Sequence, residues 1–342
     1  MRKFVRPAFL AAFVAGCLLS SAAARSAASL TFAWTDYARP HRLIDVGGRR
    51  LNLFCLGSGT PTVILDSGLG DDITAWRRVH AELARTTRVC AYDRAGYGFS
   101  DPGPMPRSAS ALSDDLERLI RAARLKAPYV IVGGSIAGLH TRLFVDRHLK
   151  EMGGVVLVDP SFEHQVARYE DATPAYRASA EQQLATYQSC IAGLGDGTPP
   201  QTSQVWKDCI GDSEPDLPAT VTHALVARIT PDFYRSALSE VLEFEGESGD
   251  EVDASRRSWG NLPLIVLTAG GTGTPDRDQA IRNRVWMEAH DRIAALSTRG
   301  VNRVVPNATH HIQLSRPDAV VAAVNEVIEA VRTNERDQLS RQ

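Results

Sequence analysis

Short apolar runs of strand length recur along the chain, and longer segments with helical spacing separate them. Residues 42–46 and 50–56 alternate apolar and polar positions on either side of Gly47-Gly48, which predicts two paired strands. Four continuous apolar runs follow, at residues 61–66, 88–92, 128–132 and 155–158. Continuous runs of this kind are typical of strands that are buried on both faces of a sheet.

The segments between these runs predict helices. Residues 75–86 and 136–150 have helical character, and residues 113–124 place Leu116, Leu119 and Ile120 on one apolar face. Buried strands that alternate with helices of about 10–15 residues indicate a parallel sheet covered on both faces. The pattern therefore predicts an α/β fold with a mostly parallel, twisted sheet.

The alternation stops after residue 160. Residues 161–258 are polar and helical only in places. The alternation then resumes with two strands and a closing helix, at residues 262–267, 301–305 and 318–332. We interpret residues 161–258 as a mainly helical cap inserted into one core, which consists of residues 25–160 and 259–342.

The first 24 residues predict a secretion signal that is removed. Three basic residues precede an apolar run over residues 8–19, and small residues follow at 22–24. The run is shorter than the roughly 20 residues that a membrane-spanning helix needs, so no stable span is expected. The protein is expected to be periplasmic or extracellular. Residues 14–17 resemble a bacterial lipobox, which leaves lipid attachment at Cys17 as an alternative.

Composition narrows the functional classes. The 342 residues suffice for one large domain, and the net charge of -2 points to neither nucleic acid nor an anionic membrane as a partner. Beyond the signal, four cysteines remain, which permits two disulfides in an exported protein without fixing their pairing. No cysteine or histidine spacing suits a zinc site, and no cofactor is implied. Nothing in the sequence fixes the oligomeric state.

The strongest chemical signal is a serine between a strand and a helix. The strand that ends at residue 132 leads into Gly133-Gly134-Ser135-Ile136-Ala137-Gly138, and a helix follows directly. A nucleophile elbow requires this strand–turn–helix context, with small residues around a serine in a strained conformation. Ala137 stands where the usual pattern has its last glycine. We interpret Ser135 as a nucleophile.

Together with residues 61–70 and 88–100, this elbow resembles the α/β-hydrolase superfamily, and within it the capped bacterial serine hydrolases. The likeness extends over residues 42–332 and is weakest across the cap. It implies the α/β-hydrolase fold and a loop at residues 67–70 that supplies an oxyanion hole. The backbone N–H groups of Leu69 and Ile136 would then face the developing oxyanion. For Asp93 and Arg94, both a loop-anchoring role and a catalytic role remain open.

The resemblance also implies a base and an acid. His310 corresponds to the family's histidine on the loop after the last strand, with His311 beside it. The usual acid position, after residue 267, holds no carboxylate. Asp159, which ends an earlier strand, is therefore the preferred acid, and Asp276 and Asp278 are the alternatives. The order Ser135, Asp159, His310 agrees with the order in this fold.

The family fold further implies that the strand near Cys55 lies antiparallel to the strand near Cys90. A Cys55–Cys90 bridge is then plausible, and Cys190–Cys209 would staple the cap. Aromatic side chains of the cap would form an apolar lid or pack the cap onto the core: Tyr169, Tyr176, Tyr187, Trp206, Phe233, Tyr234 and Phe244.

These residues predict a serine hydrolase that cleaves a carboxylic ester of a small molecule through an acyl-enzyme on Ser135. A proline-iminopeptidase-like aminopeptidase is an alternative, in which Glu243, Glu245 or Glu247 would bind an amine. A non-catalytic exported binding protein on the same fold is the other. An aspartate at position 135 would have indicated a dehalogenase or an epoxide hydrolase. The substrate itself is not predicted.

Overall fold

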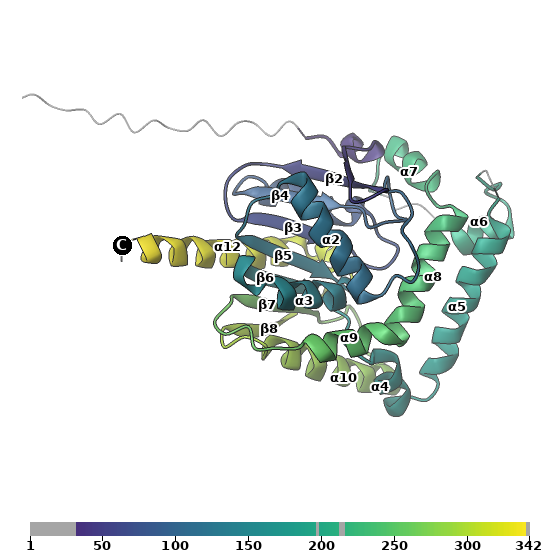
Figure 1. The fold of residues 1–342 in the computed structure, drawn as a ribbon. Coiled ribbons are helices and arrows are strands. Elements are labelled where there is room, and N and C mark those ends of the chain that lie inside the picture. The colour runs from purple at the N-terminus through teal and green to yellow at the C-terminus, as the bar shows by residue number, and fades with distance from the viewer. Residues whose placement is uncertain (1–31, 196–197, 212–215, 340–342) are drawn as a thin grey trace, which may run out of the picture.

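The structure, a computed structural model, describes residues 32–195, 198–211 and 216–339, and a sheet of eight strands forms its centre (Figure 1). The strands are β1 Arg42–Asp45, β2 Arg50–Leu56, β3 Thr62–Asp66, β4 Arg88–Tyr92, β5 Tyr129–Gly134, β6 Met152–Val158, β7 Leu264–Ala269 and β8 Gly300–Val305. All eight lie where the hydrophobic pattern predicts strands.

The strand order is β1-β2-β4-β3-β5-β6-β7-β8. β2 is antiparallel to β1 and β4, and the pairs from β4 to β8 are parallel. Cys55 lies directly opposite Cys90 across the β2–β4 pair, and these two cysteines form a disulfide. Because parallel strands end at one edge, the loops after β3, β5, β6 and β7 meet there, as ligand-binding loops do in such sheets.

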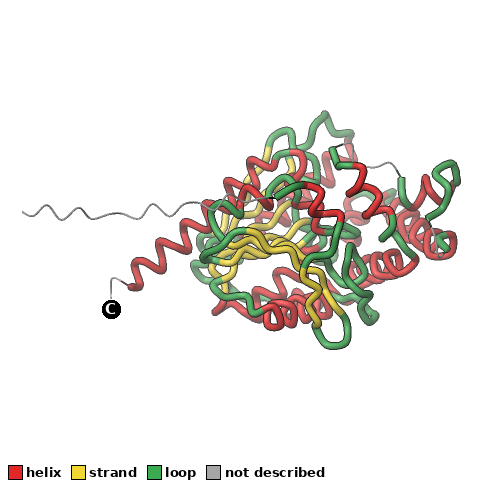
Figure 2. The backbone as a smooth tube through the Cα atoms, turned by 90° about the horizontal axis from the view of Figure 1, so that it is seen from above, coloured by secondary structure: helices red, strands yellow, loops and turns green. Residues whose placement is uncertain are grey.

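Helices cover both faces of this sheet, as Figure 2 shows. Alternate residues of one strand face opposite sides, so Ile64 packs with α2 (Ala109–Ala123), α3 (Ala137–His148) and α10 (Arg277–Ala294). Val63 and Leu65 pack with α1 (His80–Leu83) and α12 (Pro317–Leu339) on the other side. This confirms the predicted α/β fold.

Two predicted helices differ from the observed ones. The single helix expected at residues 75–86 is instead a 3-10 turn, η2 Ile73–Trp76, followed by the short α1. Asp72 caps this turn by accepting from Thr74 N, and the Asp93 carboxylate accepts from Ile73 N, so tertiary contacts fix a tight turn. Helix α2 begins four residues earlier than predicted, since the Ser108 hydroxyl accepts from Ala111 N and caps it.

Six helices occupy the described part of the chain between β6 and β7, and we call this segment the helical insertion. They are α4 Gln165–Ala172, α5 Tyr176–Gly193, α6 Gln204–Cys209, α7 Ala219–Val226, α8 Pro231–Glu245 and α9 Glu247–Ser255. Figure 1 shows α5, α6 and α8 beyond one end of the sheet, opposite the end from which α12 projects. A disulfide between Cys190 and Cys209 joins α5 to α6.

The remaining short elements are η1 Trp34–Ala38, η3 Leu149–Glu151 and α11 Ile312–Ser315. The predicted signal at residues 1–24, with Cys17, lies outside the described residues. Among the helices of residues 32–195, 198–211 and 216–339, none combines the length and apolar character needed to cross a membrane.

Candidate active site

Ser135 lies in the turn between β5 and α3, with a φ of 53°. This left-handed conformation is strained for a residue with a side chain and is found at functional sites. Backbone hydrogen bonds hold the turn: Ser135 N donates to Val158 O, and Ser135 O accepts from Gly138 N and Ser161 N. The neighbouring loop after β6 therefore fixes the serine as firmly as its own strand does.

Two glycines make this turn possible. A Cβ atom at Gly133 would lie 2.7 Å from Thr141 Oγ1, and one at Gly138 would lie 2.5 Å from Pro160 Cβ. Ala137, between Ser135 and Gly138, is fully buried with its methyl group accommodated. The close approach of backbone thus falls at Gly138, which is why alanine is tolerated at position 137.

His310 lies between Ser135 and Asp159. Its Nε2 is 2.8 Å from Ser135 Oγ, and its Nδ1 is 2.7 Å from Asp159 Oδ2. With the proton on Nδ1, the imidazole donates to the carboxylate, and Nε2 accepts from the serine hydroxyl. The three residues come from the loops after β5, β6 and β8, so the sheet edge brings together the predicted nucleophile, base and acid.

The Asp159 side chain is buried and held by three donors. Its Oδ1 accepts from Ala269 N at 2.9 Å and from Trp286 Nε1 at 2.8 Å, and Oδ2 faces His310. Burial alone would raise the pKa of Asp159, but the hydrogen bond and charge of His310, with these donors, lower the pKa below its ordinary value. Trp286 is a part of the site that the sequence did not reveal, because it lies 127 residues from Asp159.

The competing residues lie elsewhere. Asp276 caps α10, where its Oδ1 accepts from Gln279 N at 2.7 Å, and Asp278 lies exposed in the first turn of that helix. The His311 ring does not join the serine; its Nε2 lies 3.7 Å from Asp71 Oδ2. His140, on α3, is buried and bonded to Asp66.

Arg94 determines which way the loop at residues 67–70 faces. Its guanidinium donates to the carbonyl oxygens of Ser67 and Gly68. Since the peptide unit is planar and trans, a Gly68 C=O that points toward Arg94 directs the Leu69 N–H to the opposite side. Gly68 itself lies close to the serine, because a Cβ atom there would lie 3.4 Å from Ser135 Cβ.

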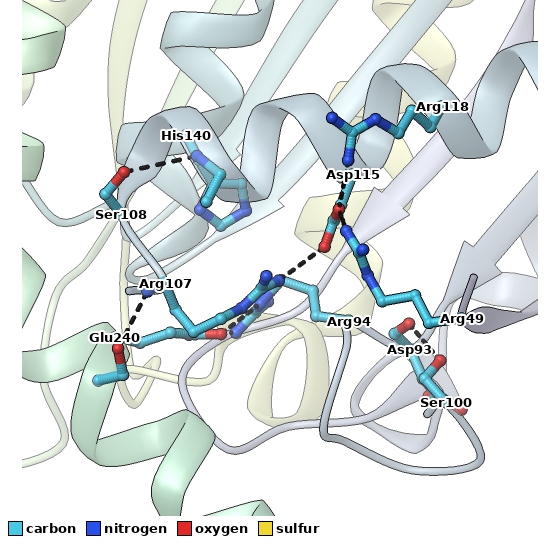
Figure 3. Close-up of polar contacts among 12 residues, drawn as sticks. Arg49, Asp93, Arg94, Ser100, Arg107, Ser108, Asp115, Arg118, His140 and Glu240 are labelled. Carbon is cyan, nitrogen blue, oxygen red and sulfur yellow. Dashed lines mark hydrogen bonds and ion pairs between the residues drawn. The ribbon is translucent and has the colours of Figure 1, made fainter. Parts of the chain in front are cut away.

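Arg94 is itself held by two buried carboxylates, one of which, Glu240, is labelled in Figure 3. It forms two hydrogen bonds to Glu240 of α8, at 3.2 and 2.9 Å, and one to Asp66 at 3.1 Å. Asp66 also accepts from Tyr92 and bonds His140. The helical insertion, through Glu240, is therefore tied to the loop that carries Leu69.

Asp93 has a different set of partners. One carboxylate oxygen accepts from Ile73 N, and the other accepts from Asn52 Nδ2 and Phe99 N. Burial, with the charge of Asp72, raises the pKa of Asp93 to about 7. These bonds anchor the loop after β4, and none of them reaches Ser135 or His310.

Ile136 is the N-cap residue of α3, directly before the first helical residue. The first N–H groups of a helix have no carbonyl partner within the helix, and the helix dipole adds positive potential there. Leu69 and Ile136 both line the cavity that contains Ser135 and His310. Both residues therefore lie beside the serine, as the predicted oxyanion hole requires.

This active-site cavity has a volume of about 180 Å³. The sheet edge and α10 contribute Leu69, Ser135, Ile136, Trp286 and His310, and the helical insertion contributes Ser161, Gln165, Val166, Tyr176, Ala180, Gln183, Val241, Phe244 and Glu245. Of the seven aromatic residues proposed for a lid, Tyr176 and Phe244 line the cavity. Tyr187, Phe233 and Tyr234 instead pack against one another. Among the described residues, no cluster of histidine, cysteine and acidic side chains suits a metal ion.

Comparison with known proteins places this fold and site in context. A model described as the alpha/beta hydrolase family matches residues 63–323. Uncharacterized protein YqjL of Bacillus subtilis is 23% identical over 271 residues, which are 79% of this chain and 85% of that protein. The probable transporter efuK of Hormonema carpetanum is 33% identical over 157 residues, which are 44% of this chain but 23% of that longer protein.

Solved structures show the same fold at low identity. A putative lipase from Acinetobacter baumannii AYE aligns with a TM-score of 0.60 at 19% identity, covering 88% of this chain and 95% of that one. A thermophilic esterase from Thermogutta terrifontis aligns with a TM-score of 0.55 at 20% identity, covering 83% of this chain and 94% of that one.

Proposed function

The chain belongs to the alpha/beta hydrolase family, and we propose that this hydrolase is an exported serine esterase that forms an acyl-enzyme on Ser135. The observation that carries the proposal is the chain of hydrogen bonds from Ser135 Oγ through His310 to Asp159, at 2.8 and 2.7 Å. Distances of this length allow the imidazole to accept the hydroxyl proton as the oxygen attacks.

In the first half of the reaction, His310 Nε2 takes the proton from Ser135 Oγ, which attacks the carbonyl carbon of the substrate. The Leu69 and Ile136 amides stabilise the tetrahedral oxyanion, and Asp159 stabilises the imidazolium. When the tetrahedral intermediate collapses, His310 returns its proton to the leaving alcohol. An acyl group then remains on Ser135.

Water completes the cycle. His310 removes a proton from the water, whose oxygen attacks the acyl carbon, and the second tetrahedral intermediate is held by the same two amides. Collapse releases the carboxylic acid and restores the serine hydroxyl. This sequence uses only groups of the chain and two small molecules, the ester and water.

We further propose that residues 161–258 act as a cap over a core of residues 25–160 and 259–342. The insertion supplies nine of the fourteen residues that line the active-site cavity. Its helices therefore decide which acyl and alcohol groups fit. A cavity of about 180 Å³ favours short acyl chains over long ones.

Export is part of this proposal. The segment at residues 1–24 has the charge and apolar pattern of a signal, and the chain holds two cysteine pairs at disulfide distance. Disulfides persist in oxidising compartments, such as the periplasm or the extracellular space. The intact mass of the secreted protein, with and without reductant and alkylation, tests both the cleavage and the two bridges.

An aminopeptidase is the second candidate, and Glu245 is the residue that favours it. Glu245 lines the active-site cavity and forms no ion pair with a described residue, whereas Glu243 and Glu247 do not line the cavity. An unpaired carboxylate at this place suits a substrate ammonium group. Hydrolysis of a prolyl naphthylamide, but not of its N-acetylated form, would favour this candidate over the esterase.

The proposal is tested by labelling the mature protein with a fluorophosphonate, which reacts with activated serines. We expect labelling of the wild type, none in Ser135→Ala and little in His310→Ala. Ser161→Ala is the matched control, because it removes the other serine hydroxyl of the cavity and should retain the label. A folded wild type that resists labelling and hydrolyses no short-chain nitrophenyl ester would favour a non-catalytic binding protein instead.

A further inference from the structure

A second cavity, with four arginines among its nine lining residues, lies apart from the active site. It has a volume of about 90 Å³, and its charged lining consists of Arg142, Arg168, Arg256, Arg292 and Glu163. We call it the arginine pocket. It shares no lining residue with the active-site cavity.

Four parts of the chain converge on this pocket. Arg142 comes from α3, Arg168 from α4, Arg256 from the end of α9 and Arg292 from α10. Figure 1 shows α4, α9 and α10 next to one another, on the same side of the sheet as α3. Residues distant in sequence thus place four positive charges around one small space, where repulsion destabilises the empty pocket.

The single carboxylate of the lining is already occupied. Glu163 accepts from Arg142 Nη2 at 2.7 Å and also pairs with Arg256, which contacts Asp253 as well. Glu163 therefore compensates two of the four guanidinium groups. It has no oxygen left over for the other two.

The other two arginines have no acidic partner within ion-pair distance among the described residues. Arg168 lies over the Phe162 ring, at 6.0 Å from its centroid, and neither its side chain nor that of Arg292 donates a hydrogen bond to a described residue. The two charges oppose each other: burial and then the charge of Arg168 lower the pKa of Arg292. An anion between them would relieve this repulsion.

The buried Arg142 is a fixed part of the pocket wall. Its side chain is 2% exposed, and its Nε and Nη2 donate to Gly138 O and Glu163. Its Nη1 has no hydrogen-bond partner among the described residues. A guanidinium that lines a cavity, is held rigidly and keeps an unused N–H suits an anion oxygen, because its orientation costs no further entropy.

From this arrangement we propose that the arginine pocket is a binding site for a small dianionic oxyanion of the phosphate type. Guanidinium groups match phosphate oxygens in geometry, and an excess of cations over one carboxylate favours two negative charges over one. The pocket volume of about 90 Å³ is several times the ~10–15 Å³ that one water molecule needs, so the pocket has room for the oxygens of a phosphate group. The site is independent of the proposed hydrolysis.

The experiment is calorimetric titration of the full mature chain with inorganic phosphate, with glycerol phosphate as a phosphate monoester, and with acetate and chloride at matched ionic strength. We expect saturable binding of inorganic phosphate or of the monoester. Tighter binding of the monoester would identify a phosphorylated molecule as the ligand, and equal binding would identify the free ion. Acetate and chloride should bind at least tenfold more weakly, because each carries one charge.

The variants Arg168→Gln and Arg292→Gln remove unpaired, exposed guanidinium groups, so both should fold. Each should weaken phosphate binding by about tenfold, as expected for one charge-assisted hydrogen bond. Arg299→Gln is the matched control, an exposed arginine outside the pocket, and should bind as the wild type does. Ser135→Ala should also bind phosphate normally, which separates this site from the proposed catalysis. The proposal would be overturned if the titration heats with phosphate and with the monoester did not saturate, or if both pocket variants bound phosphate as tightly as the wild type.

Discussion

The sheet edge and the helical insertion contribute to the active site in different ways. Ser135, Asp159 and His310 lie on loops that begin where strands end, and each is fixed by backbone hydrogen bonds or by a neighbouring side chain. The insertion instead contributes side chains from helix faces, such as Glu240 and Glu245 on α8. The comparison shows that strand order positions the proposed catalytic groups, whereas helix packing positions the side chains of the insertion that we propose select the substrate and orient the oxyanion loop.

The largest expected effect belongs to the sheet edge. Ser135→Ala should lower kcat by about 10⁴-fold or more, since the nucleophile is lost while the oxyanion donors remain. Single-turnover kinetics with a short-chain ester would measure this. The temperature of thermal unfolding should be nearly unchanged, because alanine keeps the Cβ atom that makes the φ of 53° strained. A variant that retains more than a tenth of the activity would contradict the assignment of Ser135.

The next effect links the two regions. Glu240→Leu leaves the buried Arg94 with one carboxylate fewer, and loss of one partner of such a pair destabilises by about 3–5 kcal/mol. Because Arg94 holds the Gly68 carbonyl, the Leu69 amide should also lose its orientation, and kcat should fall by about 100-fold with little change in KM.

Glu240→Gln is the matched variant for this test. It keeps an acceptor for Arg94 without the charge, so it should recover most of the kcat even where stability stays reduced. If Glu240→Leu lost stability alone, with kcat intact, the link between the insertion and the oxyanion loop would be purely structural.

Low pH should lower the free energy of unfolding through the core, where two buried histidines lie, more than through the helical insertion. Burial lowers the pKa of both His80 and His290 to about 4. Each is neutral when folded and takes up a proton on unfolding, so the free energy of unfolding falls as pH drops from about 6.5 toward 4. The loss per histidine should reach at most about 3 kcal/mol. Urea unfolding between pH 7 and pH 4 measures it; a stability that does not vary over this range would refute the expectation.

Trp286 tests how firmly the acid must be held. Trp286→Phe removes one donor to Asp159 while keeping an aromatic ring, and should lower kcat by about tenfold at neutral pH, as expected for one hydrogen bond to a charged group. The pKa of Asp159 should rise with the lost donor, so activity should fall off at a higher pH on the acid side. The pH profiles of the variant and the wild type make this comparison.

The smallest effect is expected at Glu245. Glu245→Gln should leave kcat for neutral esters unchanged, because the residue lies in the cavity wall and not on a reacting atom. For an ester with an ammonium group, KM should rise by a few-fold, as expected for an exposed ion pair. Equal KM values for charged and neutral esters in both proteins would show that this side chain does not select the substrate.

The sequence predicts the strands and the three residues of the proposed triad better than it predicts the residues that hold them in place. Alternation of buried runs locates all eight strands, and the strand–turn–helix context singles out Ser135. Asp159 emerges because no carboxylate follows residue 267. Each of these signals lies in a short stretch of sequence, and the order nucleophile, acid, base along the chain relates them to one another.

The residues that hold the site in place have no such local sequence signal. Glu240 lies 146 residues from Arg94, and nothing in the intervening sequence marks the pair. Three acidic residues alternate at positions 243, 245 and 247, and only the packing of α8 decides that Glu245 faces the cavity. The helix predicted at residues 75–86 is replaced by a 3-10 turn and a short helix for the same reason. The Asp93 carboxylate, which lies on another loop, accepts a hydrogen bond from Ile73 N and fixes the turn.

The position of Trp286 has an optical consequence. Its indole donates to Asp159, and its ring lies 6.0 Å from the ring of His310. Indole fluorescence is sensitive to a nearby charge, and the imidazole gains and loses a proton in each half of the proposed cycle. The difference in emission between the wild type and Trp286→Phe is therefore an intrinsic fluorescence signal from which a stopped-flow experiment can measure the rates of acylation and deacylation.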